Sequence, residues 1–183
     1  MNIETTPIKD LIIINPSVYN DDRGYFYESY NQRFFRDKGI YTNFVQDNQS
    51  YSTKNVLRGL HFQNMVPQAK LVRCVVGEIY DVVVDLRKSS ENYKQWFGIK
   101  LSEENKKMMF VPKGFAHGFL TLSDHAIFHY KCDEFYMATT DAGINFKDED
   151  LKIDWGIDTN LIITSEKDRV LPRLIDIEKE LLF

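Results

Sequence analysis

The sequence has few of the residues that would tie it to an oxidising compartment, a membrane or a nucleic acid. With only 2 cysteines, Cys74 and Cys132, and no signal peptide, we expect a reduced cytoplasmic protein. The N-terminal apolar run, residues 11–14, is far too short to direct export or to span a bilayer. Because the net charge is −4 and the pI is near 5.6, we expect no nucleic-acid partner and no membrane partner.

Linkers, repeats and long helices are also absent. No Pro/Gly/Ser-rich stretch divides the 183 residues, so we interpret residues 1–183 as a single domain. Helix patterns are confined to two short segments, "NQRFFRDKGI", which ends at Gly39, and "RLIDIEKELLF" at the C-terminus. What is abundant is aromatic residues, at 14% with 13 Phe and 10 Tyr, and this content favours sheet.

Short runs of β-branched and aromatic residues, separated by turn residues, predict a mainly β fold: a double-sheet barrel or jelly roll with a few short helices. The runs are residues 11–14, 24–30, 43–47, 56–63, 70–76, 78–86, 96–101, 107–111, 118–121 and 126–132. The segment "LVRCVVGEIYDVVVDLR" predicts a hairpin that turns at Gly77 and Glu78. Its second arm is apolar on both faces apart from Asp81 and Asp85, which is typical of a strand between two layers.

The stretch "VLRGLHFQ" places His61 in a strand, where an imidazole could bind a metal, move a proton or fill a core. Jelly-roll barrels of the cupin type bind metals through two blocks of histidine and carboxylate ligands. The second block is partly present as a Pro-x-Gly-x-x-His pattern that ends at His117. In the first block, Gln63 replaces a histidine and Lys70 stands at the carboxylate position. An ammonium repels a cation, so we predict a barrel without a metal site.

The remaining polar residues favour proton transfer. Strand alternation places His61, Lys70 and Tyr130 on one barrel-facing set, with His117 at the start of another strand. A neutral histidine accepts a proton, a tyrosine donates one, and a lysine stabilises an oxyanion that forms on a carbonyl. Histidine and tyrosine also have a purely structural interpretation, whereas a lysine directed into a barrel is costly unless an anion binds there. The pattern alone gives catalysis a modest advantage over ligand binding.

Motifs along nearly the whole chain resemble those of one enzyme family. They are "NDDRGYFYESYNQRFF", "FVQDN", "NVLRGLHFQ", "QAKLVRCVVGEIYDVVVDLRKSS", "VPKGFAHGFLTLSD", "FHYKCDEFY", "DLKIDW" and "SEKD". The set is similar to that of the dTDP-4-dehydrorhamnose 3,5-epimerases of nucleotide-sugar metabolism. The resemblance implies a homodimeric cupin fold with no metal or other cofactor. It also implies that dTDP-4-dehydro-6-deoxy-glucose is epimerised at both carbons beside its C4 ketone, giving dTDP-4-dehydro-rhamnose of L configuration.

The resemblance implies roles for single residues. His61 is then the proton acceptor and Asp168 orients it, while Tyr130 is the proton donor and Lys70 stabilises the enolate. For substrate binding, the resemblance implies that Arg23 and Arg58 contact the diphosphate and that Tyr136 stacks on thymine. The other implied substrate contacts are Glu28, Gln46, Asp47, Asn48, His117, Asp141 and Lys167.

Some positions depart from the family pattern, and none of them removes a proposed catalytic group. Ala69 replaces a common glycine, Asp141 a common glutamate and Phe146 a usual tryptophan. His129 replaces an aliphatic residue, and we interpret both His125 and His129 as structural because they lie off the barrel-facing set. These departures could alter contacts to the sugar or the base.

Three alternatives stay open. The first is an epimerase that acts only at C3 or only at C5, the second is a sugar-nucleotide-binding cupin without catalysis, and the third is a metal-dependent cupin oxygenase. Retention of a base, an acid, a lysine and an orienting aspartate argues against the second, because binding needs no base. The exposed aromatic segment "GYFYESY" needs cover, and this agrees with a homodimer.

Overall fold

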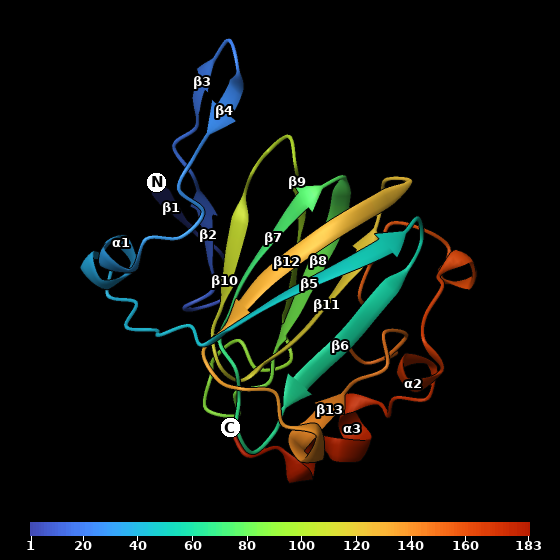
Figure 1. The fold of residues 1–183 in the computed structure, drawn as a ribbon. Coiled ribbons are helices and arrows are strands. Elements are labelled where there is room, and N and C mark those ends of the chain that lie inside the picture. The colour runs from blue at the N-terminus through green and yellow to red at the C-terminus, as the bar shows by residue number, and fades with distance from the viewer.

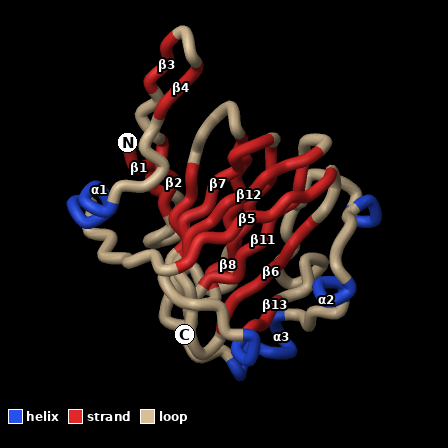
Figure 2. The backbone as a smooth tube through the Cα atoms, viewed as in Figure 1, coloured by secondary structure: helices blue, strands red, loops and turns tan.

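The computed structural model describes residues 1–183 as two antiparallel sheets packed face to face, with short helices at their edges (Figure 1, Figure 2). The six-stranded sheet has the order β1 (Asn2–Thr5), β2 (Ile12–Asn15), β10 (Met108–Val111), β7 (Lys70–Val76), β12 (His125–Cys132) and β5 (Gln46–Thr53). The five-stranded sheet has the order β13 (Asp141–Gly143), β6 (Leu57–Gln63), β11 (Phe115–Thr121), β8 (Glu78–Asp85) and β9 (Trp96–Ser102). The predicted mainly β, double-sheet fold is confirmed.

Side chains that alternate along the strands fill the space between the sheets. Ile79 and Val83 on β8 pack there with Phe128 on β12, and all three are at most 2% exposed. The other face of β8 carries Val82, which packs in a second core with Trp155 of the C-terminal segment. Full burial of such side chains contributes roughly 1.5–3 kcal/mol each. Strand β8 is therefore covered on both faces, as its sequence predicted.

The predicted hairpin at Gly77 and Glu78 is wrong, because β7 and β8 belong to different sheets. Gly77 alone separates the two strands, which is one residue fewer than the shortest common hairpin loop needs. Its φ is +76°, and a Cβ at this position would lie 2.2 Å from the carbonyl oxygen of His125. The chain therefore crosses between the sheets here, and β7 and β8 supply opposite walls of the interior.

Other strands also differ from the prediction: β3 (Tyr19–Asp21) and β13 were missed, and β11 begins at Phe115 where residues 118–121 were predicted. A strand was predicted over residues 43–47, but β5 begins at Gln46 and continues through the polar sequence "QDNQSYST". Its inner face borders a cavity and not a core, so hydrophobic alternation does not reveal it. Strand β1 was missed because it lies, mostly exposed, at a sheet edge. The strand predicted over residues 24–30 is only β4 (Gly24–Phe26), paired with β3 in a hairpin that projects beyond both sheets (Figure 1).

The helices are all short. Helix α1 (Gln32–Asp37) begins after Asn31, whose side chain accepts a hydrogen bond from the Phe34 N–H, and it ends before Gly39 as predicted. The C-terminal segment forms α3 (Leu174–Ile177) and the 3₁₀ turn η3 (Glu178–Glu180) where one helix was predicted. The elements η1 (Ala138–Thr140), η2 (Thr159–Leu161) and α2 (Glu166–Arg169) were not predicted. None of the helices has the length and apolar character needed to cross a membrane.

Candidate active site

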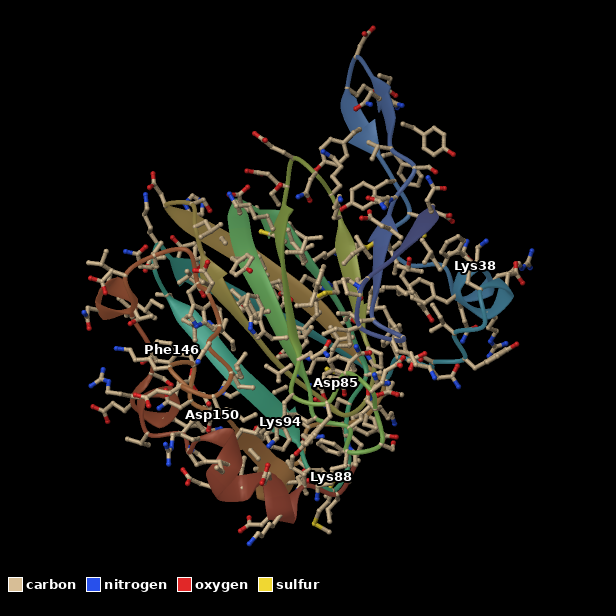
Figure 3. All side chains as sticks on the ribbon, turned by 180° about the vertical axis from the view of Figure 1, so that it is seen from behind. Lys38, Asp85, Lys88, Lys94, Phe146 and Asp150 are labelled. Carbon is tan, nitrogen blue, oxygen red and sulfur yellow. The ribbon has the colours of Figure 1, made fainter.

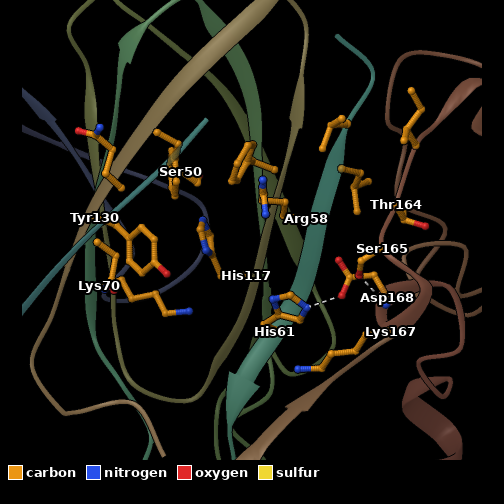
Figure 4. A pocket seen from close by; sticks show the side chains of 17 residues that line it. Ser50, Arg58, His61, Lys70, His117, Tyr130, Thr164, Ser165, Lys167 and Asp168 are labelled. Carbon is orange, nitrogen blue, oxygen red and sulfur yellow. Dashed lines mark hydrogen bonds and ion pairs between the residues drawn. The ribbon is translucent and has the colours of Figure 1, made fainter. Parts of the chain in front are cut away.

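A cavity of about 590 Å³ opens between the two sheets (Figure 4). This volume lies within the range of about 300–1,000 Å³ that is usual for small-molecule sites. Strands β6 and β11 line one wall, β5, β7 and β12 line the other, and the segment around α2 closes one side. The lining residues are Asn48, Gln49, Ser50, Val56, Leu57, Arg58, His61, Lys70, His117, Phe119, Phe128, Tyr130, Ile163, Thr164, Ser165, Lys167 and Asp168.

His61 and His117 stand opposite each other on the neighbouring strands β6 and β11. The approach of these strands depends on two glycines, because a Cβ on Gly59 would lie 2.6 Å from the Cα of Gly118. The register shifts between His117 and Phe119, just after the paired histidines. The Arg-Gly-Leu-His sequence therefore has a structural reason for its glycine, and both imidazoles reach the cavity.

His61 forms a pair with Asp168, whose carboxylate Oδ1 lies 2.7 Å from the imidazole Nε2. The backbone N–H of Gly59 donates to the other carboxylate oxygen at 3.3 Å. Burial alone would raise the pKa of Asp168, but the hydrogen bonds from His61 and Gly59 outweigh it and hold the pKa below its ordinary value. A carboxylate that accepts the Nε2–H leaves the lone pair on Nδ1, so His61 can act as a base.

The element that supplies Asp168 was not predicted as a helix. Ser165 caps α2, and its Oγ accepts the backbone N–H of Asp168 at 3.1 Å. A serine followed three residues later by an acidic residue is a helix-start pattern, so the sequence held the information that was needed to find α2. The cap fixes the first turn of α2 and thereby presents the Asp168 carboxylate to β6.

Tyr130 and Lys70 lie on the wall opposite His61, on β12 and β7 (Figure 4). Burial raises the pKa of the Tyr130 hydroxyl, which therefore keeps its proton as an acid must. Burial lowers the pKa of Lys70, and the charges of nearby Cys132, Asp81 and Asp141 partly offset that effect. A lysine in this position is suited to an anion or to a carbonyl oxygen that gains negative charge.

Two further cations border the cavity. The guanidinium of Arg58 donates to the Ser52 Oγ at 2.9 Å and to the Tyr51 carbonyl at 3.1 Å. Lys167 Nζ lies 2.5 Å from Asp141 Oδ2, which also accepts the Tyr136 hydroxyl at 3.0 Å. Asp141 and Tyr136 do not line the cavity, but Asp141 binds the lining residue Lys167. An arginine and a lysine that line one cavity are suited to binding phosphate groups.

Of the predicted run of residues 46–48, only Asn48 lines the cavity. Gln46 lies nearby: its amide nitrogen donates to the Asn48 side chain at 2.9 Å, and its oxygen accepts the Tyr136 N–H at 3.1 Å. Asp47 instead forms an ion pair with Lys131 at 2.7 Å. Alternation along β5 places Asp47 on the exposed outer face of the strand, between the half-buried Gln46 and Asn48.

Arg23 and Glu28 are not brought to the cavity of their own chain. Arg23 lies at the tip of the β3–β4 hairpin, where its side chain is 90% exposed and pairs with Asp21 at 2.6 Å. Glu28 follows the hairpin and accepts a hydrogen bond from Asn31 at 3.0 Å. Their roles in substrate binding stay predictions.

The structure also adds one cavity residue that was not predicted, and it locates the departures from the family pattern. The Ser50 Oγ lines the cavity, is buried and has no hydrogen-bond partner, yet a serine in a polar strand carries no sequence signal. Phe146 is 6% exposed in the second core, and neither His125 nor His129 lines the cavity. Of the departures from the family pattern, Asp141 is therefore the one tied directly to a lining residue, Lys167.

The possible metal ligands that reach the cavity include two histidines, each already hydrogen-bonded to an aspartate, and Lys70 lines the same cavity. His61 binds Asp168 and His117 binds Asp81, with Nε2–oxygen distances of 2.7 Å and 2.9 Å. No group of three or more His, Cys, Asp or Glu side chains converges as a metal ion would require.

Comparison with known proteins agrees with this geometry. The dTDP-4-dehydrorhamnose 3,5-epimerase family pattern matches residues 5–176. A dTDP-4-dehydrorhamnose 3,5-epimerase of Methanothermobacter thermautotrophicus is 53% identical over 165 residues, which cover 90% of this chain and 89% of that protein.

Solved structures show the same relationship. The Legionella pneumophila epimerase RmlC, crystallised with dTDP-4-keto-L-rhamnose, superposes with a TM-score of 0.95 at 46% identity, covering 99% of this chain and 96% of that one. ChmJ, a 3′-monoepimerase of Streptomyces bikiniensis in complex with dTDP-quinovose, superposes with a TM-score of 0.88 at 29% identity, covering 96% and 89%. On these grounds the chain belongs to the dTDP-4-dehydrorhamnose 3,5-epimerase family.

Proposed function

We propose that this protein is the 3,5-epimerase that converts dTDP-4-dehydro-6-deoxy-α-D-glucose to dTDP-4-dehydro-β-L-rhamnose. The observation that carries the proposal is the arrangement of the cavity. The His61–Asp168 pair belongs to one wall and Tyr130 to the other, which is the geometry that inversion at carbon requires. A base and an acid on the same wall would return the proton to the face it left.

The stereochemistry of the substrate fits a single base. In a D-gluco ring the hydrogens on C3 and C5 point to the same face, and the C4 ketone acidifies both. His61 removes one of these protons, and the electron pair of the broken C–H bond moves into an enolate whose oxygen Lys70 stabilises. Tyr130 then donates a proton to the opposite face of that carbon. His61 releases its proton to solvent and Tyr130 takes one up from solvent, which restores the base and the acid. Repetition at the second carbon completes the conversion.

The nucleotide is bound at the cavity mouth in this proposal. Arg58 and Lys167 are the cations that line the cavity there, and they are suited to a diphosphate. Tyr136 is 54% exposed and linked to Lys167 through Asp141, so its ring is available for stacking on thymine. The sugar then extends from the diphosphate toward His61 and Lys70.

We further propose a homodimer in which the β3–β4 hairpin of each chain reaches the cavity of its partner. The support is that Tyr19, Tyr25 and Phe26 gather on this one hairpin and are 66%, 57% and 66% exposed, because a cluster of exposed apolar residues marks an interaction surface. Arg23 at the hairpin tip has no role in its own cavity. A second copy would cover the aromatics and receive the arginine.

A complementation experiment tests the dimer. Arg23→Ala and His61→Ala are each expected to have low activity, and co-refolding them as a mixture restores activity if Arg23 acts on the partner's cavity. One site of the mixed dimer then has both residues intact. If Arg23 acts within its own chain, every site lacks one residue and the mixture stays as inactive as its components.

Product analysis in deuterated water tests the reaction. The purified protein is incubated with dTDP-4-dehydro-6-deoxy-glucose, the product is trapped by a rhamnose-forming reductase, and deuterium is located by NMR. The proposal requires deuterium at both C3 and C5. Label at one carbon assigns the protein to the monoepimerase activity that ChmJ has, and absence of label with intact dTDP binding identifies a binding protein.

A further inference from the structure

A second histidine–aspartate pair lies directly behind the cavity wall. The Nε2 of His117 is 2.9 Å and 3.1 Å from the two carboxylate oxygens of Asp81. Asp81 is on β8 and is a diagonal neighbour of His117, because the register pairs Asp81 with Phe119 and His117 with Val83. It is 0% exposed and does not line the cavity, so it reaches the site only through the residues in front of it.

The buried carboxylate of Asp81 has no ion-pair partner among the lysines and arginines. A buried carboxylate needs a counter-charge, and Asp85, four residues along the same strand, has one in Arg87 at 2.8 Å. Burial raises the pKa of Asp81, while His117 and then Lys70 favour its charged form. Lys70 lies on the facing sheet and makes no ion pair of its own. Asp81 and Lys70 each favour the charged form of the other across the interior.

We propose that Asp81 is a positioning residue of the epimerase site: it holds the His117 ring by Nε2 and supplies the counter-charge of the Lys70 ammonium. This inference rests on the proposed function, in which Lys70 stabilises the enolate. Since Nε2–H is donated to a carboxylate, the Nδ1 of His117 carries a lone pair and can only accept a hydrogen bond. His117 therefore receives a sugar hydroxyl and leaves the ketone oxygen to Lys70.

The substitution Asp81→Asn isolates the charge. Its amide oxygen still accepts the Nε2–H of His117, but the negative charge is gone. We expect kcat to fall about 10-fold to 100-fold, as when the partner of a functional histidine is removed, with a much smaller change in KM. The alkaline limb of kcat/KM moves to lower pH, because Lys70 loses a group that favours its ammonium form. An unchanged kcat with an unchanged alkaline limb overturns the proposal.

Other groups face Lys70 and stay constant in this comparison. They are Tyr130 and Cys132 on β12, His61 on β6, His117 on β11 and Asp141 on β13. A shift of the alkaline limb on Asp81→Asn is then attributable to the one charge that was removed.

The tautomer of His117 gives a readout that needs no turnover. In ¹⁵N NMR of the wild type at neutral pH, we expect His117 to carry its proton on Nε2, with Nδ1 unprotonated. Asp81→Asn keeps this tautomer and Asp81→Ala loses it. A wild-type His117 protonated on Nδ1, or on both nitrogens, contradicts the proposal. Absence of turnover in the wild type contradicts the epimerase function instead, so the two failures are distinguishable.

Asp85→Asn is the matched control. Asp85 lies on the same strand with the same burial, and it binds Arg87 and Ser90 toward the end of the barrel near Lys88 (Figure 3). We expect Asp85→Asn to lower Tm but to keep kcat, the alkaline limb and the His117 tautomer. A loss of kcat equal to that of Asp81→Asn would attribute both effects to the loss of a buried charge and overturn the assignment.

Discussion

His61 and His117 are paired across neighbouring strands, yet only one of them is placed to act as the base. Each binds its own aspartate, but the side chain of His61 is 34% exposed and that of His117 is 7% exposed. Both imidazoles line the cavity, but the more open one exchanges its proton with solvent more readily, so the proposed reaction assigns the role of base to His61. Exposure, and not the identity of the partner, is the difference between the two histidines.

Replacement of His61 by alanine is expected to lower kcat by at least about 10²–10⁴-fold, the usual contribution of a general base. Affinity for dTDP, measured by calorimetry, is expected to stay close to that of the wild type, because in the proposed binding mode it is the sugar and not the nucleotide that reaches His61. His125→Ala is the control, since His125 is exposed on β12 and does not line the cavity. Substantial activity in His61→Ala would show that another group is the base.

Tyr130→Phe is expected to separate proton removal from inversion. His61 still removes the proton, so the recovered substrate exchanges its hydrogen with deuterated water, while product formation falls by about 10²-fold or more. NMR of the recovered substrate and of the product measures the two rates in one experiment. Equal losses of exchange and of product formation would contradict a role confined to proton donation.

Asp168 is expected to contribute stability that depends on pH. Its pKa is lowered in the folded protein, so this contribution is fully present above the pKa of an unfolded aspartate, about 3.9, and is lost as pH falls through the lower folded value. Wild-type Tm should therefore exceed that of Asp168→Asn at neutral pH, and the gap should narrow in acid. Calorimetry from pH 7 down to about pH 2, below the pKa of an unfolded aspartate, measures this, and a constant gap contradicts it.

The alkaline limb of kcat/KM is expected to report Lys70. Burial lowers the pKa of Lys70, so its ammonium is lost at a lower pH than that of a free lysine, and activity falls with it. Burial raises the pKa of Tyr130, which is still protonated at that point. The deuterium-exchange rate of Tyr130→Phe should show the same limb. Its disappearance in that variant would assign the limb to Tyr130.

Local sequence patterns predicted most of the strands of the fold. Strands such as β8 and β12 are rich in β-branched and aromatic residues, and their apolar spacing predicts them without knowledge of their neighbours. Strand β5 escaped prediction because its inner face borders a cavity. The β7–β8 hairpin was wrong because a glycine turn by itself does not say whether the chain returns to the same sheet.

The site residues likewise fall into those that the sequence predicted and one whose contact depends on the tertiary structure. His61, Lys70 and Tyr130 were placed on one barrel-facing set from alternation, and His117 was placed at the start of another strand. All four line the cavity. Asp81 was noticed only as a charge in an apolar strand, and its contact with His117 depends on the register of β8 against β11.

By itself, the sequence determined the strand-rich architecture, the replacement of a metal-ligand position by Lys70 and the family to which the chain belongs. These follow from residue type, from period-2 alternation and from motif order, which are all properties of the chain read in one dimension. The family resemblance implied that Asp168 orients His61, but no local pattern links these residues across 107 positions. Only the tertiary structure decided that His61 and Tyr130 occupy opposite walls and that Arg23 lies outside its own cavity. Such relationships depend on how the two sheets pack and cross over, and side chains distant in the chain have no local pattern that links them.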